Sequence, residues 1–262
     1  MKIGIISDIH ANWEALEAAD KILFDVQQVW CLGDIVGYGA DPRLCLEYIR
    51  QRCQIKLKGN HDQAVADLRN IDFFNPVAKQ AVLWTRNQLS ADDCRFLAQL
   101  PSSLSVTTED RSLPVVWLVH GSLRSPLEEY ILDAATAQAT QTLLAQQAQE
   151  VHFPKDAPVL LFFGHSHLAE VYIFNDKGKK LQHLSVTTEQ RLTLEGGWYY
   201  LVNVGSVGQP RDGVPLGSCA ILDTDQWTIQ IIRFGYPIAV AAQKILQAGL
   251  PAELAYRLFY GW

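Results

Sequence analysis

The sequence predicts an α/β protein (α+β) in which two packed β-sheets form a sandwich flanked by helices. Strand-like and helix-like segments alternate over the first sixty residues, and short strand-like segments dominate after residue 158. Nearly half of the 262 residues are apolar, which is enough for a large core. Because no linker interrupts these patterns, we expect one domain over residues 1–262, with helical insertions at about 63–105 and 125–150.

The N-terminal part predicts a parallel sheet with crossover helices. The runs "KIGIIS", "VQQVWCL" and "CQIKLK" read as strands, and the amphipathic "WEALEAADKILFD" separates the first two. A second helix is expected after Asp41 as N-cap, with Pro42 at its first position. These segments give three strands linked by helices.

Helix signals mark both insertions. In the first, Asn75-Pro76 opens one helix and Ser90 caps another, which Pro101 ends. The run "LPVVWLVHG" then returns to a strand. The second insertion is expected to open at Ser125-Pro126 and to continue through the Ala/Gln-rich "ATAQATQTLLAQQAQE".

After "APVLLFFGHSH" the pattern changes to short strands separated by turn residues, which favours antiparallel pairing. The strands are expected in "EVYIF", "KLQHLSV", "QRLTLE", "WYYLVNV", "SCAILD" and "WTIQIIRF", followed by a helix in "IAVAAQKILQAGL". We therefore expect a first sheet rich in parallel strands and a second sheet that is mostly antiparallel.

Charge and composition exclude several classes of function. The net charge of -6 and the pI near 5.6 make binding of long nucleic acids or of anionic membranes unlikely. No apolar stretch is long enough for a signal peptide or a membrane span, and five scattered cysteines without a C-x-x-C spacing fit reduced thiols. These features predict a cytoplasmic protein.

Polar side chains follow almost every apolar strand-like run. Because the carboxyl ends of parallel strands form one edge of a sheet, these side chains are expected to converge there. A single histidine in such a place is usually structural, but five of the seven histidines occupy these positions. The candidate group comprises Asp8, His10, Asp34, Asn60, His61, His120, His165 and His167.

This group predicts a metal site. Its donors are nitrogen and oxygen without sulfur, which favours Mn, Fe, Zn, Co or Ni. Eight groups are too many for one ion with four to six ligands, and they suit two ions that share a carboxylate. The identity of the metal stays open.

The ordered motifs "DIH", "GDIVG", "GNHD", "VHG" and "GHSH" resemble those of the calcineurin-like metallophosphoesterase family. The later "NVGSVGQPRDG" resembles the glycine-rich stretch of its bacterial phosphoesterase branch, which is related to diadenosine tetraphosphate hydrolases. The resemblance implies a four-layer αββα fold and two divalent ions. It also implies hydrolysis of a small phosphoester or dinucleoside polyphosphate through attack by a metal-activated hydroxide.

The resemblance further implies roles for single residues. One ion would be bound by Asp8, His10 and His167, and the other by Asn60, His120 and His165. Asp34 would bridge both ions and be part of the catalytic machinery. His61 would face the substrate as a proton donor or a transition-state stabiliser.

Four residues have alternative interpretations. Asp62 could orient His61 or its loop, or it could cap the helix that follows, and the cap is favoured. Arg124 and Arg211 could bind a substrate phosphate or be ordinary surface arginines. Tyr38 could contact substrate or pack beside the turn. The aromatic C-terminal "AELAYRLFYGW" could dock on its own domain or on a second subunit of a homo-oligomer.

Other functions are disfavoured but remain alternatives. Serine/threonine phosphoprotein phosphatases of the superfamily carry a "GDxxDRG" pattern, whereas Gly37 and Tyr38 occupy the positions of its second aspartate and its arginine here. A catalytically inactive metal-binding scaffold is less favoured because Asp34, Asn60 and His61 are all present. A nuclease acting on long polymers is disfavoured by the acidic charge. The expected partner is a small phosphoester or nucleotide substrate, and no association with a membrane is expected.

Overall fold

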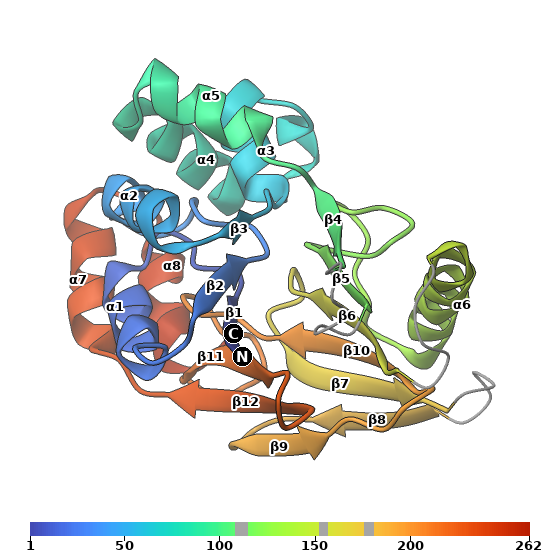
Figure 1. Cartoon of the computed structure of the whole chain (residues 1–262). Helices are drawn as coiled ribbons and strands as arrows, with labels where there is room; N and C mark the ends of the chain where they lie inside the picture. Colours follow the sequence, from blue (N-terminus) through green and yellow to red (C-terminus); the bar gives the residue numbers. More distant parts are fainter. Residues whose placement is uncertain (108–114, 152–156, 176–180) are drawn as a thin grey trace.

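The computed structural model describes residues 1–107, 115–151, 157–175 and 181–262, which form two six-stranded sheets (Figure 1). The first sheet has the order β3-β2-β1-β11-β12-β9. It comprises β1 (Lys2–Ile6), β2 (Gln28–Cys31), β3 (Ile55–Lys56), β9 (Gln190–Thr193), β11 (Gly217–Asp223) and β12 (Thr228–Phe234). The second sheet has the order β4-β5-β6-β10-β7-β8. It comprises β4 (Ser103–Val106), β5 (Val115–Val119), β6 (Val159–Phe163), β7 (Ala169–Phe174), β8 (Leu181–Ser185) and β10 (Tyr199–Val204).

The predicted sandwich is confirmed, but the predicted division of strand directions between the sheets is wrong. Each sheet is mixed: β1, β2 and β3 are parallel in the first sheet, and β5, β6 and β10 are parallel in the second. The late strand β11 pairs antiparallel with β1, where Lys2 lies opposite Asp223. Late strands thus complete both sheets and do not form a sheet of their own.

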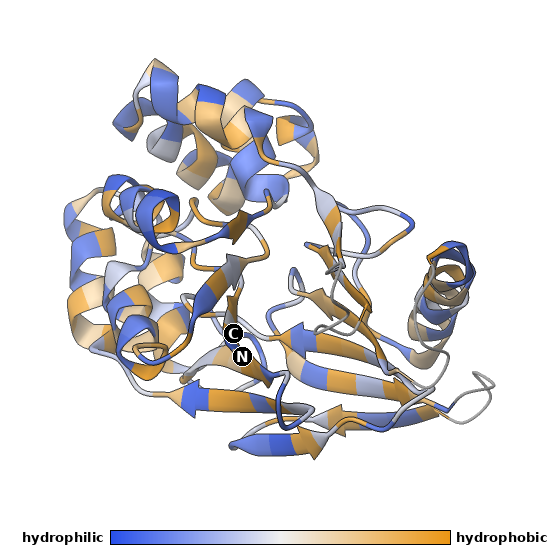
Figure 2. Ribbon diagram, in the orientation of Figure 1, coloured by the Kyte–Doolittle hydropathy of each residue, from blue (hydrophilic) through white to orange (hydrophobic). Residues whose placement is uncertain are grey.

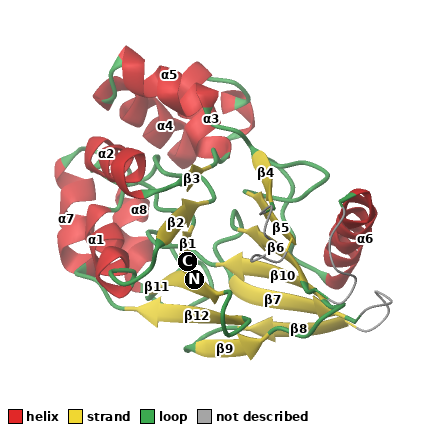
Figure 3. Cartoon of the chain, viewed as in Figure 1, coloured by secondary structure: helices red, strands yellow, loops and turns green. Residues whose placement is uncertain are grey.

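Helices cover the outer face of each sheet and produce the four layers (Figure 3). The first sheet is covered by α1 (Trp13–Ile22), α2 (Pro42–Arg52), α7 (Ile238–Gln247) and α8 (Ala252–Tyr256). The second sheet is covered by α6 (Ala134–Glu150). Within the described ranges, no helix has the length and the apolar character needed to cross a bilayer.

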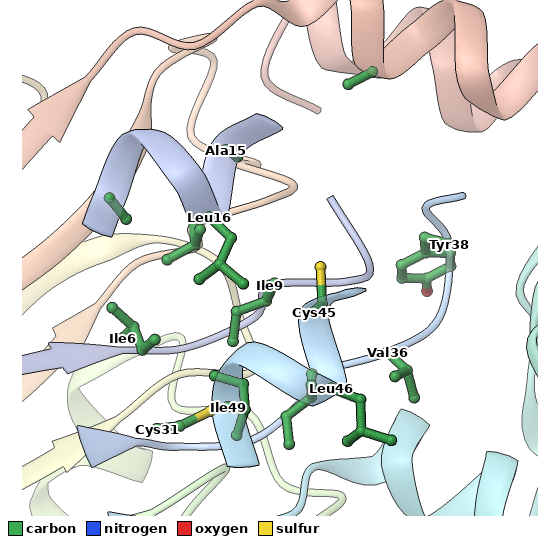
Figure 4. Close-up of a cluster of buried hydrophobic side chains, with 14 of the residues drawn as sticks. Ile6, Ile9, Ala15, Leu16, Cys31, Val36, Tyr38, Cys45, Leu46 and Ile49 are labelled. Carbon is green, nitrogen blue, oxygen red and sulfur yellow. The ribbon is translucent and has the colours of Figure 1, made fainter. Parts of the chain in front are cut away.

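Three clusters of apolar side chains hold the layers together, and strand β6 shows how. Leu160 and Phe162 belong to the core between the sheets, whereas Leu161 and Phe163 pack against α6. This alternation follows from the two-residue period of a strand that is buried on both faces. Figure 2 shows the hydrophobic residues concentrated on the strands and on the inner faces of the helices. Figure 4 shows the third cluster, where α1 and α2 pack over the first sheet.

The first helical insertion contains α3 (Asn60–Asp67), α4 (Pro76–Gln88) and α5 (Ala91–Gln99). The predicted caps are present: Asn75 Oδ1 accepts from the Ala78 N–H at 2.9 Å, and Ser90 Oγ accepts from the Asp93 N–H at 3.1 Å. Helical structure ends before residue 105, because β4 pairs antiparallel with β5. The start of α3 at Asn60 places the "GNHD" motif at a helix N-terminus.

The second insertion begins later than expected. Helix α6 starts at Ala134, after Asp133, whose side chain accepts from the Thr136 N–H at 2.8 Å. The expected start at Ser125 is therefore wrong. Residues 125–133 form a loop in which Ser125 Oγ donates to Glu128 at 2.6 Å. This loop extends from the end of β5 toward the converging strand ends.

Candidate metal centre

The candidate ligands converge at the carboxyl ends of parallel strands from both sheets. Asp8 and His10 follow β1, Asp34 follows β2, and Asn60 begins the helix after β3. His120 directly follows β5 in the second sheet, and His165 and His167 follow β6. Every one of these carboxylates and imidazoles is buried. The rule that polar groups gather at this edge therefore places them correctly.

The donor atoms form two groups that share Asp34. In one group, atoms of Asp8, His10, Asp34 and His167 all lie within 4.8 Å of one another. In the other, the same holds for Asp34, His120 and His165. Asp34 Oδ2 lies 3.5 Å from His10 Nε2 and 3.4 Å from His120 Nε2. Either group could hold a metal ion.

Several of these atoms are buried without a hydrogen-bond partner in the described structure: Asp8 Oδ1, Asn60 Oδ1, His120 Nε2 and His165 Nε2. An unsatisfied buried polar atom costs about 1–3 kcal/mol, so four of them in one cluster call for a ligand. Two nitrogens bound to one ion at about 2.1 Å would lie roughly 3.0–3.4 Å apart. His10 Nε2 and His167 Nε2 are 3.1 Å apart. The donor set therefore fits divalent ions.

Backbone carbonyls fix the orientation of three imidazoles. The Nδ1 atoms of His10 and His120 lie 3.3 Å and 3.1 Å from the carbonyl oxygens of Val36 and Leu32. The Nδ1 atom of His167 contacts the Gln209 carbonyl in the same way. An Nδ1–H that donates to a carbonyl leaves the Nε2 lone pair free for a metal. This is the arrangement expected of metal-binding histidines.

The backbone at the site is strained. Five of the candidate ligands have left-handed φ values between 49° and 68°: Asp8, His10, Asp34, His165 and His167. This conformation costs non-glycine residues of the order of 1 kcal/mol or more each and persists only when neighbouring structure enforces it. The glycine-rich stretch enforces it at Asp8, whose carbonyl accepts from Ser206 Oγ at 2.8 Å and from the Gly208 N–H at 3.0 Å.

Burial and mutual charge set the protonation of the cluster. Burial lowers the pKa of His165 to about 3 and that of His10 and His167 well below the usual value, so these imidazoles are neutral. For His120, the attraction of Asp34 outweighs burial and raises the pKa to about 9. The same attraction outweighs burial at Asp34 and keeps its pKa well below the usual value. Asp34 is thus a buried carboxylate.

Comparison with known proteins identifies the family. The sequence profile of the calcineurin-like phosphoesterase superfamily domain matches residues 1–227. The chain belongs to this superfamily. It is also 34% identical to an uncharacterized protein from Methanocaldococcus jannaschii, over 99% of this chain and 98% of that protein.

Solved structures share the superfamily fold over the full length. The crystal structure of a metallophosphoesterase from Sphaerobacter thermophilus has a TM-score of 0.83 and 38% identity, covering 100% of this chain and 99% of the other. The crystal structure of a hypothetical protein from Pyrococcus horikoshii OT3 has a TM-score of 0.72 and 19% identity, covering 100% and 98%. The second likeness concerns the fold alone.

In this member of the superfamily, His61 lies beside the two donor groups and belongs to neither. Its backbone N–H donates to Asp34 Oδ1 at 2.9 Å, and its ring meets Tyr38 at 4.3 Å and Phe74 at 4.9 Å between centroids. Its Nδ1 atom has no hydrogen-bond partner among the residues that the structure describes. Burial lowers the pKa of His61 to about 4, so the ring is neutral at neutral pH and keeps one N–H donor.

Asp62 combines two of its predicted roles. Its carboxylate accepts from the Gly59 N–H at 3.0 Å, which caps α3. It also accepts from the backbone N–H groups of Ile35 and Val36 at 3.0 Å and 3.1 Å, which ties the loop carrying Asp34 to the helix carrying Asn60. Asp62 therefore acts as a helix cap and as a positioning residue for that loop.

Two glycines allow the close packing around Asp34 and His61. A Cβ atom at Gly59 would lie 2.0 Å from Asp34 Oδ1. A Cβ atom at Gly37, whose φ is +92°, would lie 2.7 Å from His61 Nδ1. Neither position can hold a side chain without moving a site residue.

A cavity of about 520 Å³ opens above the cluster and is lined by Asn60, His61 and His165. Two aromatic residues that the sequence analysis missed also line it: Tyr130 stacks on His165 with centroids 3.8 Å apart, and Phe74 meets His61. Tyr130 lies in the loop after β5, so the same strand-end rule could have indicated it. Phe74 precedes Asn75-Pro76, where an apolar residue outside a helix is a weaker signal.

The three predicted substrate-binding residues fall in different places. Tyr38 lines the cavity and packs against both His10 and His61. The Arg211 guanidinium lies 5.7 Å from the Tyr38 ring and donates to Gln209 Oε1 at 2.7 Å. Neither arginine lines the cavity, but Arg124 forms an ion pair with Glu129 and has no contact with Tyr38 among the described residues. The structure thus brings Tyr38 and Arg211 to the site and leaves Arg124 outside it.

Proposed function

We propose that the protein hydrolyses a small phosphoester or a nucleotide with the help of two divalent ions. The observation that supports this most is that two groups of buried ligand atoms share Asp34 next to one cavity, which Asn60 and His165 line. We assign one ion to Asp8, His10 and His167, and the other to Asn60, His120 and His165. Asp34 would contact both.

Ions bound there would supply positive charge against a phosphate and acidify a water molecule enough to provide hydroxide near neutral pH. The chain's own residues set the charge that a phosphate meets. Asp8 and Asp34 are the only carboxylates among the seven proposed ligands, and Asn60 is neutral. Two divalent ions would therefore leave a net positive charge at the cavity floor, which suits a phosphate ester.

His61 is placed to act on the leaving group. It is held beside Asp34, lines the cavity and binds no ion in this assignment. Because its ring is neutral at neutral pH, its N–H can donate to the departing oxygen, so the role of transition-state stabiliser is favoured over that of a pre-charged acid. Such a group typically contributes about 10²–10⁴-fold to the rate.

The surroundings of His61 favour a small substrate over a phosphoprotein. Gly37 occupies the position at which the "GDxxDRG" pattern places an aspartate, and its Cα faces His61 Nδ1. Within the described ranges that nitrogen has no hydrogen-bond partner, and Gly37 cannot supply the carboxylate that the phosphoprotein phosphatase pattern places there. A cavity of about 520 Å³ also has the size of a small-molecule site.

A substrate panel tests the proposal. Purified protein would be assayed at fixed Mn²⁺ with an aryl phosphomonoester, an aryl phosphodiester, diadenosine tetraphosphate and a phosphopeptide, each with and without chelator. We expect metal-dependent turnover of at least one of the first three at a rate above that of the phosphopeptide. Absence of turnover with Mn²⁺, Ni²⁺, Co²⁺, Zn²⁺ and Fe²⁺ would instead support the inactive scaffold.

A further inference from the structure

A second cavity of about 440 Å³ adjoins the cavity above the metal centre. Tyr38 and Asn75 line both, so the two cavities share a wall. The rest of the second cavity, named the C-terminal cavity here, is formed mainly by residues 253–262. These residues lie beyond the part of the chain that matches the superfamily profile.

The walls of the C-terminal cavity are aromatic and open to solvent. Tyr256, Tyr260 and Trp262 line it and are 58%, 56% and 63% exposed. The rings of Tyr260 and Trp262 stack with centroids 4.8 Å apart. Because these rings remain largely exposed, they offer a stacking surface to a further flat group.

The aromatic segment is fixed next to the metal centre by its own chain. The Gly213 N–H donates to the Gly261 carbonyl at 2.9 Å, and a Cβ atom at Gly261 would lie 2.7 Å from the backbone of Val214. The segment therefore packs against the end of the glycine-rich stretch that carries Arg211. No second subunit is needed to place it.

Two arginines lie close to the boundary between the two cavities. Arg211 lies over Tyr38, and Arg257 lines the C-terminal cavity. Arg211 donates to Gln209 Oε1, and Arg257 donates to the main-chain oxygen of the last residue, Trp262. Burial and the charge of Arg211 together lower the pKa of Arg257 to about 10. A phosphate would relieve the repulsion between the two guanidinium groups.

We propose that the C-terminal cavity binds the nucleoside of a nucleotide substrate, while Arg211 and Arg257 bind phosphate groups between that nucleoside and the metal centre. Stacked aromatic rings can bind any nucleobase, and planar guanidinium groups suit phosphate oxygens. Glu253 also lines the cavity and can accept from N–H groups on the edge of a base. This inference rests on the proposed phosphoesterase function and narrows its substrate class.

A pair of diesters with the same leaving group tests the inference. The two substrates are p-nitrophenyl thymidine 5′-monophosphate and methyl p-nitrophenyl phosphate, which differ only in the nucleoside. For Trp262→Ala and Tyr260→Ala, we expect the ratio of kcat/KM between the nucleoside ester and the methyl ester to fall about tenfold or more. Phe24→Ala, which removes an exposed ring far along the chain from these residues, serves as control and should keep the wild-type ratio.

Direct binding separates this inference from the proposed function. Calorimetric titration with thymidine 5′-monophosphate needs no turnover, so it reports on the cavity even if no ester is hydrolysed. We expect weaker binding for Trp262→Ala and for Arg257→Gln than for wild type and Phe24→Ala. Equal ratios and equal affinities in all variants would overturn the inference. So would a change of oligomeric mass in Trp262→Ala at an unchanged ratio, since the cavity would then bind a second copy.

Discussion

Gly37 presents its bare Cα to the ring of His61, and a Cβ atom there would lie only 2.7 Å from His61 Nδ1. Gly59 stands in the same relation to Asp34, where a Cβ atom would lie 2.0 Å from Oδ1. The two glycines thus leave space for two different side chains of the site. One faces the residue assigned to the leaving group, and the other faces the carboxylate shared by both donor groups.

Alanine substitutions at the two glycines should therefore have different effects. Gly59→Ala should displace Asp34 and lower the metal content of the purified protein, as measured by elemental analysis. Gly37→Ala should keep the metal but displace His61, so kcat should fall by about 10²-fold or more. Gly235→Ala is the matched control, since its Cβ atom would meet nothing within 4 Å and its φ is not left-handed.

Removal of Asp34 should abolish metal binding, whereas removal of His61 should not. Outer partners of metal ligands alone typically cost 10–100-fold in affinity, so Asp34→Asn should lose more than about 100-fold. His61→Ala should retain both ions and lose about 10²–10⁴-fold in kcat. The control is His183→Ala, whose imidazole pairs with Glu170 in the second sheet. Loss of metal from His61→Ala would place His61 among the ligands and contradict the assignment.

Arg211 and Arg124 should differ in their effect on substrate binding. Arg211→Gln should raise KM at least about tenfold, because it removes a cation beside Tyr38 that a phosphate would contact. Arg124→Gln should change KM by less than about twofold, because Arg124 is paired with Glu129 outside the cavity. Initial rates over a range of ester concentrations give both values. Equal increases of KM for the two substitutions would show that Arg124 also contributes to substrate binding.

Acid should destabilise the chelated protein partly through His61. Its pKa is about 4 in the folded state and about 6.5 in a model peptide, so the unfolded state binds one more proton between these values. The contribution is fully present above pH 6.5 and is lost as the pH falls toward 4. Each extra proton contributes about 1.4 kcal/mol per pH unit to the slope of the unfolding free energy.

Urea unfolding of wild type and His61→Asn in chelator, at several pH values between 4.5 and 6.5, measures this contribution. The unfolding free energy of wild type should rise with pH more steeply than that of His61→Asn, by the equivalent of about one proton. Phe24→Ala, which replaces an exposed residue that does not titrate, should keep the wild-type slope. Parallel curves for wild type and His61→Asn would show that His61 is protonated equally in both states.

The strand-end rule accounts for most of what the sequence could predict about the site. Asp8, Asp34 and His120 each follow an apolar run, and the chemistry of their side chains does not depend on how the strands are ordered. The pairing of strands that are distant in sequence depends on tertiary contacts and could not be predicted in this way. Strand β11 pairs with β1 over more than 200 residues of sequence, and no local pattern specifies such a partner.

Local sequence signals also failed to decide between alternative helix starts and between similar side chains. Ser125-Pro126 has the pattern of a helix start, but Asp133 caps the helix eight residues later. The loop between them carries Tyr130 to His165, a contact that only the folded chain shows. Arg124 and Arg211 look alike in sequence, and only the neighbouring Glu129 distinguishes them.

The seven proposed ligands follow strands of both sheets, with Asp8, His10, Asp34 and Asn60 on one side and His120, His165 and His167 on the other. Cations held there would cross-link the two sheets, because each cation would bind side chains from segments far apart in the sequence. Metal starvation would then loosen the same interface on which turnover depends. Thermal melting with and without Mn²⁺ would show how much of the protein's cohesion comes from the ions that it uses.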